Sequence, residues 1–316
     1  MKKISILFLV LIAFACSDHQ INVPDYEVQK LVNGYSQHAS DYTSTTYYND
    51  WSGTVHTIVV ETTRAPAQAN WSATAVPSDY VLVGGGAYTN NPSPGAYLIG
   101  SYPDWSTDTW WAFSKDHHVV NSHEIRVYAV GLKIDGVTKS VLKSAMQFVQ
   151  SGWSGATNHP VNSVSVGASY NLVGGGVNTS YNITWPGSLI TESYPSATKT
   201  WSVKSKDHIY NCPASIESYA IGLPTTVSGF SGQLEVQMLT GPTDSGNSLR
   251  KSEVALASGW VPAGAGGRTT FSTGRMLIGL RPPYGASTVY KVESKDLKYH
   301  DSGDTKVYGF MIRKKP

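Results

Sequence analysis

Charged residues are scarce in this sequence of 316 residues. Asp, Glu, Lys and Arg make up only 15% of the chain, against about 25% in an average soluble domain. This composition argues against a disordered polyelectrolyte and against a coiled coil. The 24 basic residues nearly balance the 22 acidic ones, so the chain lacks the positive surface that attracts nucleic acid or anionic headgroups. We therefore expect no nucleic-acid partner.

Cysteine is almost absent, since Cys16 and Cys212 are the only two. A disulfide framework of the kind that stabilises small secreted domains is therefore excluded. Cys212 stands in an Asn-Cys-Pro segment with no His at a repeated spacing, which favours an inert thiol over a catalytic nucleophile. The fold must be stabilised by burial of apolar surface, which a chain of this length can supply.

Long hydrophobic runs are missing except at the N-terminus. Two lysines precede an uncharged apolar run over residues 4–15, which is shorter than the roughly 20 residues of a spanning helix and is typical of a signal peptide. The run ends in Ala-Phe-Ala before Cys16, and this resembles the lipobox of bacterial lipoproteins cleaved by signal peptidase II. A soluble secreted protein cleaved near Ala15 is the alternative.

The lipobox resemblance implies that residues 1–15 are removed and that Cys16 becomes the acylated first residue. Several acyl chains on one cysteine anchor a protein to a bilayer lastingly, whereas a single chain does not. The implied location is the bacterial cell envelope, most simply the outer membrane, on its periplasmic or surface face. Residues 16–50 are rich in Ser, Thr, Asp, Asn and Tyr, and we expect them to form a tether.

Internal repetition is the most prominent feature of the remaining sequence. The run Asp-Tyr-Val-Leu-Val-Gly-Gly-Gly at residues 79–86 recurs as Ser-Tyr-Asn-Leu-Val-Gly-Gly-Gly at residues 169–176. It recurs more faintly as Gly-Trp-Val-Pro-Ala-Gly-Ala-Gly at residues 259–266. These matches predict three copies of one unit, over residues 51–136, 137–226 and 227–316.

Other motifs follow the glycines in the same order. Ser-Tyr-Pro recurs in the first two copies, with Pro283 in the third place, and a strand beginning at Trp110, Trp201 or Tyr290 ends in Ser-Lys-Asp. A Tyr follows twelve residues after each Asp, at Tyr128, Tyr219 and Tyr308. The set of motifs is similar to modules of secreted bacterial proteins, many of them uncharacterised. The resemblance spans all three copies and implies no catalytic residues.

The hydrophobic pattern within each copy has a period of two, which is typical of β-strands. Clusters of Gly, Pro, Ser and Asn separate five strand candidates per copy, and no capped amphipathic helix is apparent. We therefore predict an all-β fold. It consists of three tandem sandwich-like repeats that pack with pseudo-threefold symmetry, or of a single prism or barrel built from three sectors.

The glycine triplets do not match a phosphate-binding loop, because nothing helical follows Gly86 or Gly176. Glycine inside a strand also permits close approach of another group. We predict that another backbone or an aromatic ring contacts the triplets, with Trp110 and Trp201 as the candidate rings.

Ser, Lys and Asp are residue types that occur in catalytic sites. However, adjacent residues of a strand point to opposite faces, so Lys115 cannot activate Ser114. We expect Asp116, Asp207 and Asp296 to accept hydroxyl or backbone amide hydrogen bonds at a corner, with a ligand or Ca²⁺ role as the alternative. The histidines are expected to be ordinary loop residues, with zinc as the alternative. They are His117, His118, His123 and His208. No metal or cofactor is predicted.

Ligand binding is expected on the dissimilar loops, where aromatic rings stand beside amides. The candidate residues are Tyr88, Asn90, Asn91, Trp105, Trp111, Tyr181, Asn182, Trp185 and Phe271. Such rings stack on sugars while amides bond the hydroxyls, although the same rings would also serve to plug the ends of each sandwich. We therefore expect a lectin-like binding or adhesion protein rather than an enzyme. A structural or accessory subunit that docks another envelope or secreted protein is the alternative.

Overall fold

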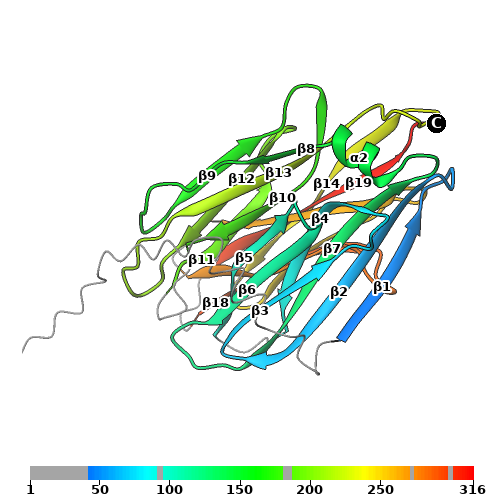
Figure 1. Cartoon of the computed structure of the whole chain (residues 1–316). Helices are drawn as coiled ribbons and strands as arrows, with labels where there is room; N and C mark the ends of the chain where they lie inside the picture. The colour runs from blue at the N-terminus through cyan, green and yellow to red at the C-terminus, as the bar shows by residue number, and fades with distance from the viewer. Residues whose placement is uncertain (1–41, 91–94, 181–186, 271–273, 298–301) are drawn as a thin grey trace, which may run out of the picture. The chain divides into compact units, whose positions relative to one another are not determined.

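The computed structural model describes residues 42–90, 95–180, 187–270, 274–297 and 302–316. The expected signal peptide, Cys16 and most of the expected tether lie outside this part of the chain. The all-β prediction is confirmed, because the described residues form three β-sheets and a single short helix (Figure 1).

An additional strand, β1 (Tyr42–Asn49), precedes three sets of six strands. The first set is β2 (Val55–Ala67), β3 (Ala69–Ala75), β4 (Val81–Thr89), β5 (Ala96–Asp104), β6 (Thr109–Asp116) and β7 (His123–Ile134). The second set is β8 (Gln147–Gln150), β9 (Val161–Ser165), β10 (Tyr170–Thr179), β11 (Leu189–Pro195), β12 (Thr200–Lys206) and β13 (Ile216–Pro224). The third set is β14 (Leu234–Gly246), β15 (Arg250–Ala255), β16 (Val261–Thr269), β17 (Arg275–Arg281), β18 (Val289–Asp296) and β19 (Gly303–Lys314).

The sequence predicted five strands per repeat, and the structure has six. The additional strand in each repeat is β3, β9 or β15, and all three lie at the edge of a sheet. Their sequences are short and rich in small or polar residues, because an edge strand buries little apolar surface. Their hydrophobic alternation was therefore too weak to identify them.

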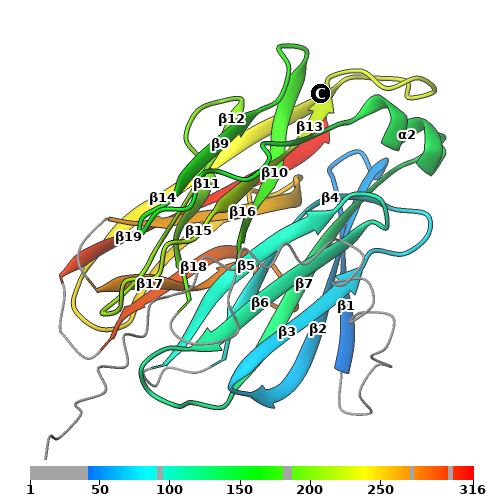
Figure 2. The ribbon, with the colours of Figure 1, turned by 60° about the vertical axis from the view of Figure 1, so that its left-hand side comes forward.

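The three sheets are each shared between two repeats. The first sheet has the order β1-β2-β7-β4-β17-β18-β15, the second β3-β6-β5-β10-β13-β8, and the third β14-β19-β16-β11-β12-β9. Each sheet thus joins three strands of one repeat to three strands of another, and the exchange runs cyclically through the repeats (Figure 2). Within each repeat the two three-stranded halves pack face to face, as Trp110 of β6 does on Gly85 of β4. The predicted sandwich-like repeats are therefore confirmed, and each sheet continues from one repeat into the next.

Two segments differ from the sequence-based prediction. The composition of residues 16–50 predicts a tether, but residues 42–49 form β1, which pairs along its whole length with β2. A helix was not predicted, yet α2 (Lys139–Ala145) connects the first two repeats beside β4 and β7. The Thr138 hydroxyl caps this helix by accepting a hydrogen bond from the Val141 amide at 3.4 Å.

The first glycine of each triplet lies at the centre where the three repeats meet. A methyl group on Gly84 would lie 2.4 Å from the Gly264 Cα, and one on Gly264 would lie 2.5 Å from the Gly174 Cα. One on Gly174 would lie 2.4 Å from the Val83 carbonyl oxygen and 3.2 Å from the Gly84 Cα. The three backbones therefore contact each other in a cycle, which requires the absence of side chains.

The second glycine of the first two triplets contacts an aromatic ring, as predicted. A Cβ on Gly85 would lie 2.3 Å from the Trp110 ring, and one on Gly175 would lie 2.4 Å from the Trp201 ring. The indole N–H groups donate to Ser101 and Ser193 at 2.9 and 3.1 Å. This contact gives the Ser of each Ser-Tyr-Pro motif a structural role.

In the third repeat, glycine and alanine have exchanged places between the two paired strands. Gly85 pairs with Ala129 and Gly175 with Ala220, whereas Ala265 pairs with Gly309. A Cβ on Gly309 would lie 2.5 Å from the Tyr290 ring. One glycine per pair is therefore retained, and it stands on whichever strand the ring approaches.

The third glycine of each triplet lies at the seam between two repeats. Gly86, Gly176 and Gly266 approach the carbonyl oxygens of Leu280, Ser101 and Ser193 on the neighbouring repeat. The prolines beside them are Pro282, Pro103 and Pro195. The third-repeat equivalent is therefore Pro282 and not Pro283, because strand register rather than residue count decides which proline meets the glycine.

Candidate functional site

The predicted ligand-binding residues lie on different sheets. Tyr88, near the end of β4, lies on the first sheet beneath the Arg281 guanidinium, whose central carbon is 4.1 Å from the ring centroid. Asn90 is tied to the Glu124 backbone and carboxylate at 3.1 Å each. Trp105 and Trp111 belong to the second sheet and its β5–β6 turn. The remaining candidates lie outside the described residues: Asn91, Tyr181, Asn182, Trp185 and Phe271.

The second sheet brings Trp105 and Trp111 together with five further rings in one continuous series, which we call the aromatic band. Its members are Trp71, Trp111, Phe113, Tyr102, Tyr219, Phe148 and Trp105. They come from β3, β6, β5, β13, β8 and the turn after β5, so the band crosses most of the sheet. Six of the seven are partly exposed, and Tyr219 is buried.

Neighbouring rings of the aromatic band are nearly parallel. Successive centroids along the band are 5.8, 6.4, 6.1, 5.5, 6.1 and 5.5 Å apart, and the angles between planes range from 1° to 27°. Parallel rings at this spacing are stacked with an offset, which is the favoured geometry for aromatic pairs. Each ring therefore covers part of its neighbour.

The strand register explains why these rings share one face. Tyr102 is directly opposite Trp111, and Trp71 is opposite Phe113, and directly paired residues point to the same side of a sheet. Trp110 alternates with Trp111 and faces the core, where it is 1% exposed. Trp110 thus packs in the core, and Trp111 lies on the opposite face of the sheet, in the aromatic band.

A cation stands at each end of the aromatic band. The Arg64 guanidinium carbon lies 4.4 Å from the Trp71 centroid, and the Lys143 ammonium lies 5.3 Å from the Trp105 centroid. Lys143 also donates to the Asp108 carboxylate at 2.9 Å, which connects α2 to the band. Cation–π contacts of this kind stabilise ring orientation.

Polar groups interrupt the aromatic band near its centre. Glu217 is 3% exposed, and its carboxylate accepts hydrogen bonds from Gln150 at 2.6 Å and from the Tyr219 hydroxyl at 2.5 Å. Burial, together with the charge of Glu217, raises the pKa of Tyr219. The phenol therefore stays protonated and donates. Asn178 is directly opposite Glu217 on the neighbouring strand.

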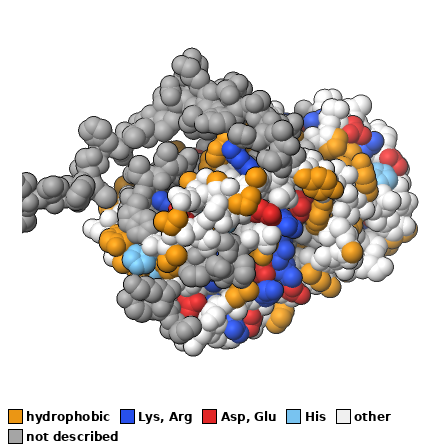
Figure 3. All heavy atoms as spheres, turned by 90° about the horizontal axis from the view of Figure 1, so that it is seen from below, with side chains coloured by type: hydrophobic (Ala, Val, Ile, Leu, Met, Phe, Trp, Pro, Cys, Tyr) orange, Lys and Arg blue, Asp and Glu red, His pale blue; other side chains and the backbone are white. Residues whose placement is uncertain are grey.

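At several positions where the second sheet has rings, the equivalent faces of the other two sheets carry charged or polar residues. The residues equivalent to Phe113 in the other repeats are Glu293 on the first sheet and Lys204 on the third sheet. Both of them form ion pairs there. Trp111 corresponds to Lys291 and Ser202. Figure 3 shows basic and acidic side chains standing next to one another on one face of the molecule. The aromatic band is therefore specific to one of three related surfaces.

The Ser-Lys-Asp carboxylates act at corners, as predicted. Asp116 accepts the Asn121 amide at 3.3 Å and Asp207 accepts the Cys212 amide at 3.1 Å, so both close the same turn. Asp296 instead accepts the Ser248 amide at 3.2 Å.

The lysines of these segments are buried, which the sequence did not reveal. Lys115, Lys206 and Lys295 are each at most 3% exposed. Burial lowers the pKa of Lys115, and it lowers the pKa of Lys295 to about 7. The Lys295 ammonium lies 5.0 Å from the Tyr97 ring centroid.

Three of the four predicted loop histidines pack in the interior, whereas His118 is partly exposed. His117 and His208 contact each other, with the His117 Nε2 2.9 Å from the His208 carbonyl oxygen. His123 bonds Ser114 at 2.8 Å. Within the described ranges, no three His, Cys, Asp or Glu side chains gather in a metal-binding arrangement, and no helix is long and apolar enough to cross a membrane. Cys212 is buried.

The sequence missed five of the seven band residues. One sequence pattern could have identified Phe113 as a band residue. Trp111 and Phe113 alternate with the core-facing Trp110 and Ala112, so they lie on the outer face of the same strand. The other rings come from separate strands and repeats, and only the register of the shared sheet aligns them. No protein-family model matches the chain, and no curated protein sequence matches it.

Proposed function

We propose that this chain is a lipid-anchored binding or adhesion protein of the bacterial cell envelope, and that the aromatic band is its glycan-binding surface. The observation that carries the proposal is the band itself, a continuous series of stacked rings across one sheet, six of them partly exposed. Rings bind the apolar faces of sugars, while neighbouring amides and carboxylates bond hydroxyl groups. Asn178 and Gln150 supply amides beside the rings.

The position of the rings supports binding rather than packing alone. A core needs its rings buried, whereas Trp111, Tyr102 and Phe148 all keep part of their surface exposed. The equivalent positions of the other sheets also tolerate polar residues, so the fold does not require a ring there. The third sheet has one such pair of rings, Tyr194 and Tyr308, whereas the second sheet extends the equivalent pair into a band, and a surface function explains this extension.

The test is glycan binding by the full-length protein in detergent, on a glycan array and by calorimetry. The variant Trp111→Ser introduces the residue that the third sheet already has at Ser202. We expect affinity to fall about three- to tenfold, because an aromatic contact contributes about 0.5–1.5 kcal/mol. Phe113→Lys, which introduces the residue type found at Lys204 on the third sheet, should act in the same direction.

The matched control is Tyr194→Ala, which removes the third-sheet equivalent of Tyr102. It should leave glycan affinity unchanged while perturbing the fold to a similar extent. Affinity that survives both second-sheet substitutions would refute the assignment of the band. Absence of any glycan binding would instead favour an accessory subunit that docks another envelope protein.

A further inference from the structure

The carboxylate of Glu217 is the unusual feature of the aromatic band. It is 3% exposed, and its hydrogen-bond donors, Gln150 and Tyr219, are both neutral. Among the described residues no cation forms an ion pair with it. A buried carboxylate is costly unless a positive charge compensates it, and two neutral donors leave part of its accepting capacity unused.

The other two sheets place a cation at this position. Glu217 stands two residues before Tyr219, and the corresponding residues before Tyr128 and Tyr308 are Arg126 and Lys306. A negative charge at this place is therefore peculiar to the second sheet.

In the third sheet, the protein's own cations lie over the equivalent tyrosines. Arg268 lies over the Tyr194 ring at 5.4 Å, and Lys306 lies over the Tyr308 ring at 5.9 Å. These two rings contact each other at 5.3 Å, as Tyr102 and Tyr219 do at 5.5 Å in the band.

The second sheet keeps the tyrosine pair but replaces both cations. Asn178 stands where the third sheet has Arg268, and Glu217 stands where it has Lys306. The rings that attract a cation are retained, and a carboxylate is added beside them. Rings and a carboxylate together form a site for a positively charged group.

We propose that the aromatic band binds a ligand carrying a primary ammonium group against Glu217, and specifically a glycan containing unacetylated amino sugars. This inference rests on the proposed glycan-binding function and narrows its ligand class. Gln150, which covers one oxygen of Glu217, is an exposed side chain on the edge strand β8. The incoming ammonium replaces its amide as hydrogen-bond donor, so no buried group has to move.

The experiment compares two oligosaccharides of equal length, one of glucosamine and one of N-acetylglucosamine. Calorimetry with the full-length protein is done at mildly acidic pH, where the sugar amine is protonated, and at low and high salt. We expect the glucosamine oligomer to bind at least about fivefold more tightly. The preference should shrink at high salt, because screening weakens charge attraction.

The decisive variant is Glu217→Gln, which keeps the shape of the side chain and removes the charge. It should abolish the preference, so that the two oligomers bind with similar affinity. The control Glu192→Gln removes a carboxylate that is paired with Lys204 at 3.6 Å on the third sheet, and it should leave the preference intact. Unchanged thermal unfolding of both variants confirms that the fold is preserved.

The outcomes separate this inference from the proposed function. Equal affinity for the two oligosaccharides, or a preference that survives Glu217→Gln, overturns the ammonium site. If binding nevertheless depends on Trp111, the glycan-binding function stands. Binding of neither oligosaccharide nor any other glycan overturns both.

Discussion

Three glycines determine how closely the repeats approach one another. Gly84, Gly174 and Gly264 contact each other's backbone in a cycle, and none of them has a positive φ. Their requirement is therefore space and not backbone conformation. The atoms nearest to each of these glycines belong to the backbone, so no flexible side chain can move aside to make room for a larger residue.

A substitution at this centre should be severe. We expect Gly84→Ala to lower the free energy of unfolding by more than about 3 kcal/mol, because the new methyl group overlaps the Gly264 backbone. Chemical denaturation measures the effect. The control is Gly155→Ala, where no atom lies within 4 Å of the new methyl group, and its effect should stay within about 0.5 kcal/mol. Equal effects of the two changes would disprove close packing at the centre.

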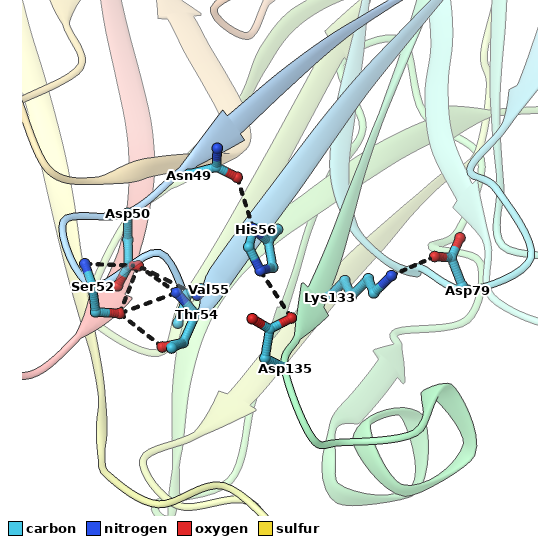
Figure 4. A network of polar contacts seen from close by, with 9 residues as sticks. All are labelled: Asn49, Asp50, Ser52, Thr54, Val55, His56, Asp79, Lys133 and Asp135. Atoms are coloured by element: carbon cyan, nitrogen blue, oxygen red, sulfur yellow. Dashed lines mark hydrogen bonds and ion pairs between the residues drawn. The ribbon is translucent and has the colours of Figure 1, made fainter.

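At the scale of elements, a network of polar contacts holds the first hairpin in place (Figure 4). Asp50, between β1 and β2, accepts the Lys314 amide at 2.8 Å and the Ser52 hydroxyl at 2.8 Å. His56 on β2 contacts Asn49 at 2.7 Å and Asp135 at 3.0 Å. Asp50 thereby connects the beginning of the described chain to its last strand, β19.

The ionisation of Asp50 should make this connection depend on pH. Burial alone would raise the pKa of its carboxyl, but hydrogen bonds from Lys314, Ser52, Val55 and Thr54 outweigh burial, so the pKa lies below its ordinary value of 3.8. A group with a lowered pKa stabilises the fold above its ordinary value. That stabilisation is lost as the pH falls through the lowered value.

We expect Asp50→Asn to lower the stability at neutral pH by about 1–3 kcal/mol, since hydrogen bonds to a charged group are lost. The difference from the unmodified protein should disappear as the pH falls below 3.8, and melting temperatures across acidic pH measure it. Asp79→Asn is the control, because the Asp79 carboxylate is exposed and paired with Lys133 at 2.8 Å, and exposed ion pairs contribute little. A difference that persists at acidic pH would contradict the role of the Asp50 charge.

At the scale of the whole molecule, shared sheets make the repeats mutually dependent. In the second sheet, β5 of the first repeat pairs with β10 of the second, and the other two sheets have equivalent seams. A single repeat would leave two half-sheets with open edges at the seams and would lose the contacts of its central glycine with the other repeats.

We therefore expect residues 51–136 expressed alone to lack a cooperative unfolding transition. The full-length protein should instead unfold in one step, with the calorimetric enthalpy equal to the van't Hoff enthalpy. Differential scanning calorimetry and circular dichroism test both statements. A stable, cooperatively folding single repeat would contradict the dependence of the three repeats on one another.

Local patterns along the chain were sufficient to predict the features of a single repeat. Period-two alternation identified the strands that bury one face, and the Gly triplets pointed to close contacts with Trp110 and Trp201. The spacing of Asp116 and Asp207 before their tyrosines identified corner-forming carboxylates. Short-range chemistry of this kind is visible along a single strand.

Strand pairing between repeats could not be predicted from local patterns, and this pairing sets which side chains meet. Trp111 and Tyr219 belong to different repeats, and they join one band because β5 pairs with β10. The edge strands, β1 and α2 bury too little apolar surface to produce a periodic signal. Glu217 became notable only when the register set it beside Asn178, where the third sheet carries two cations.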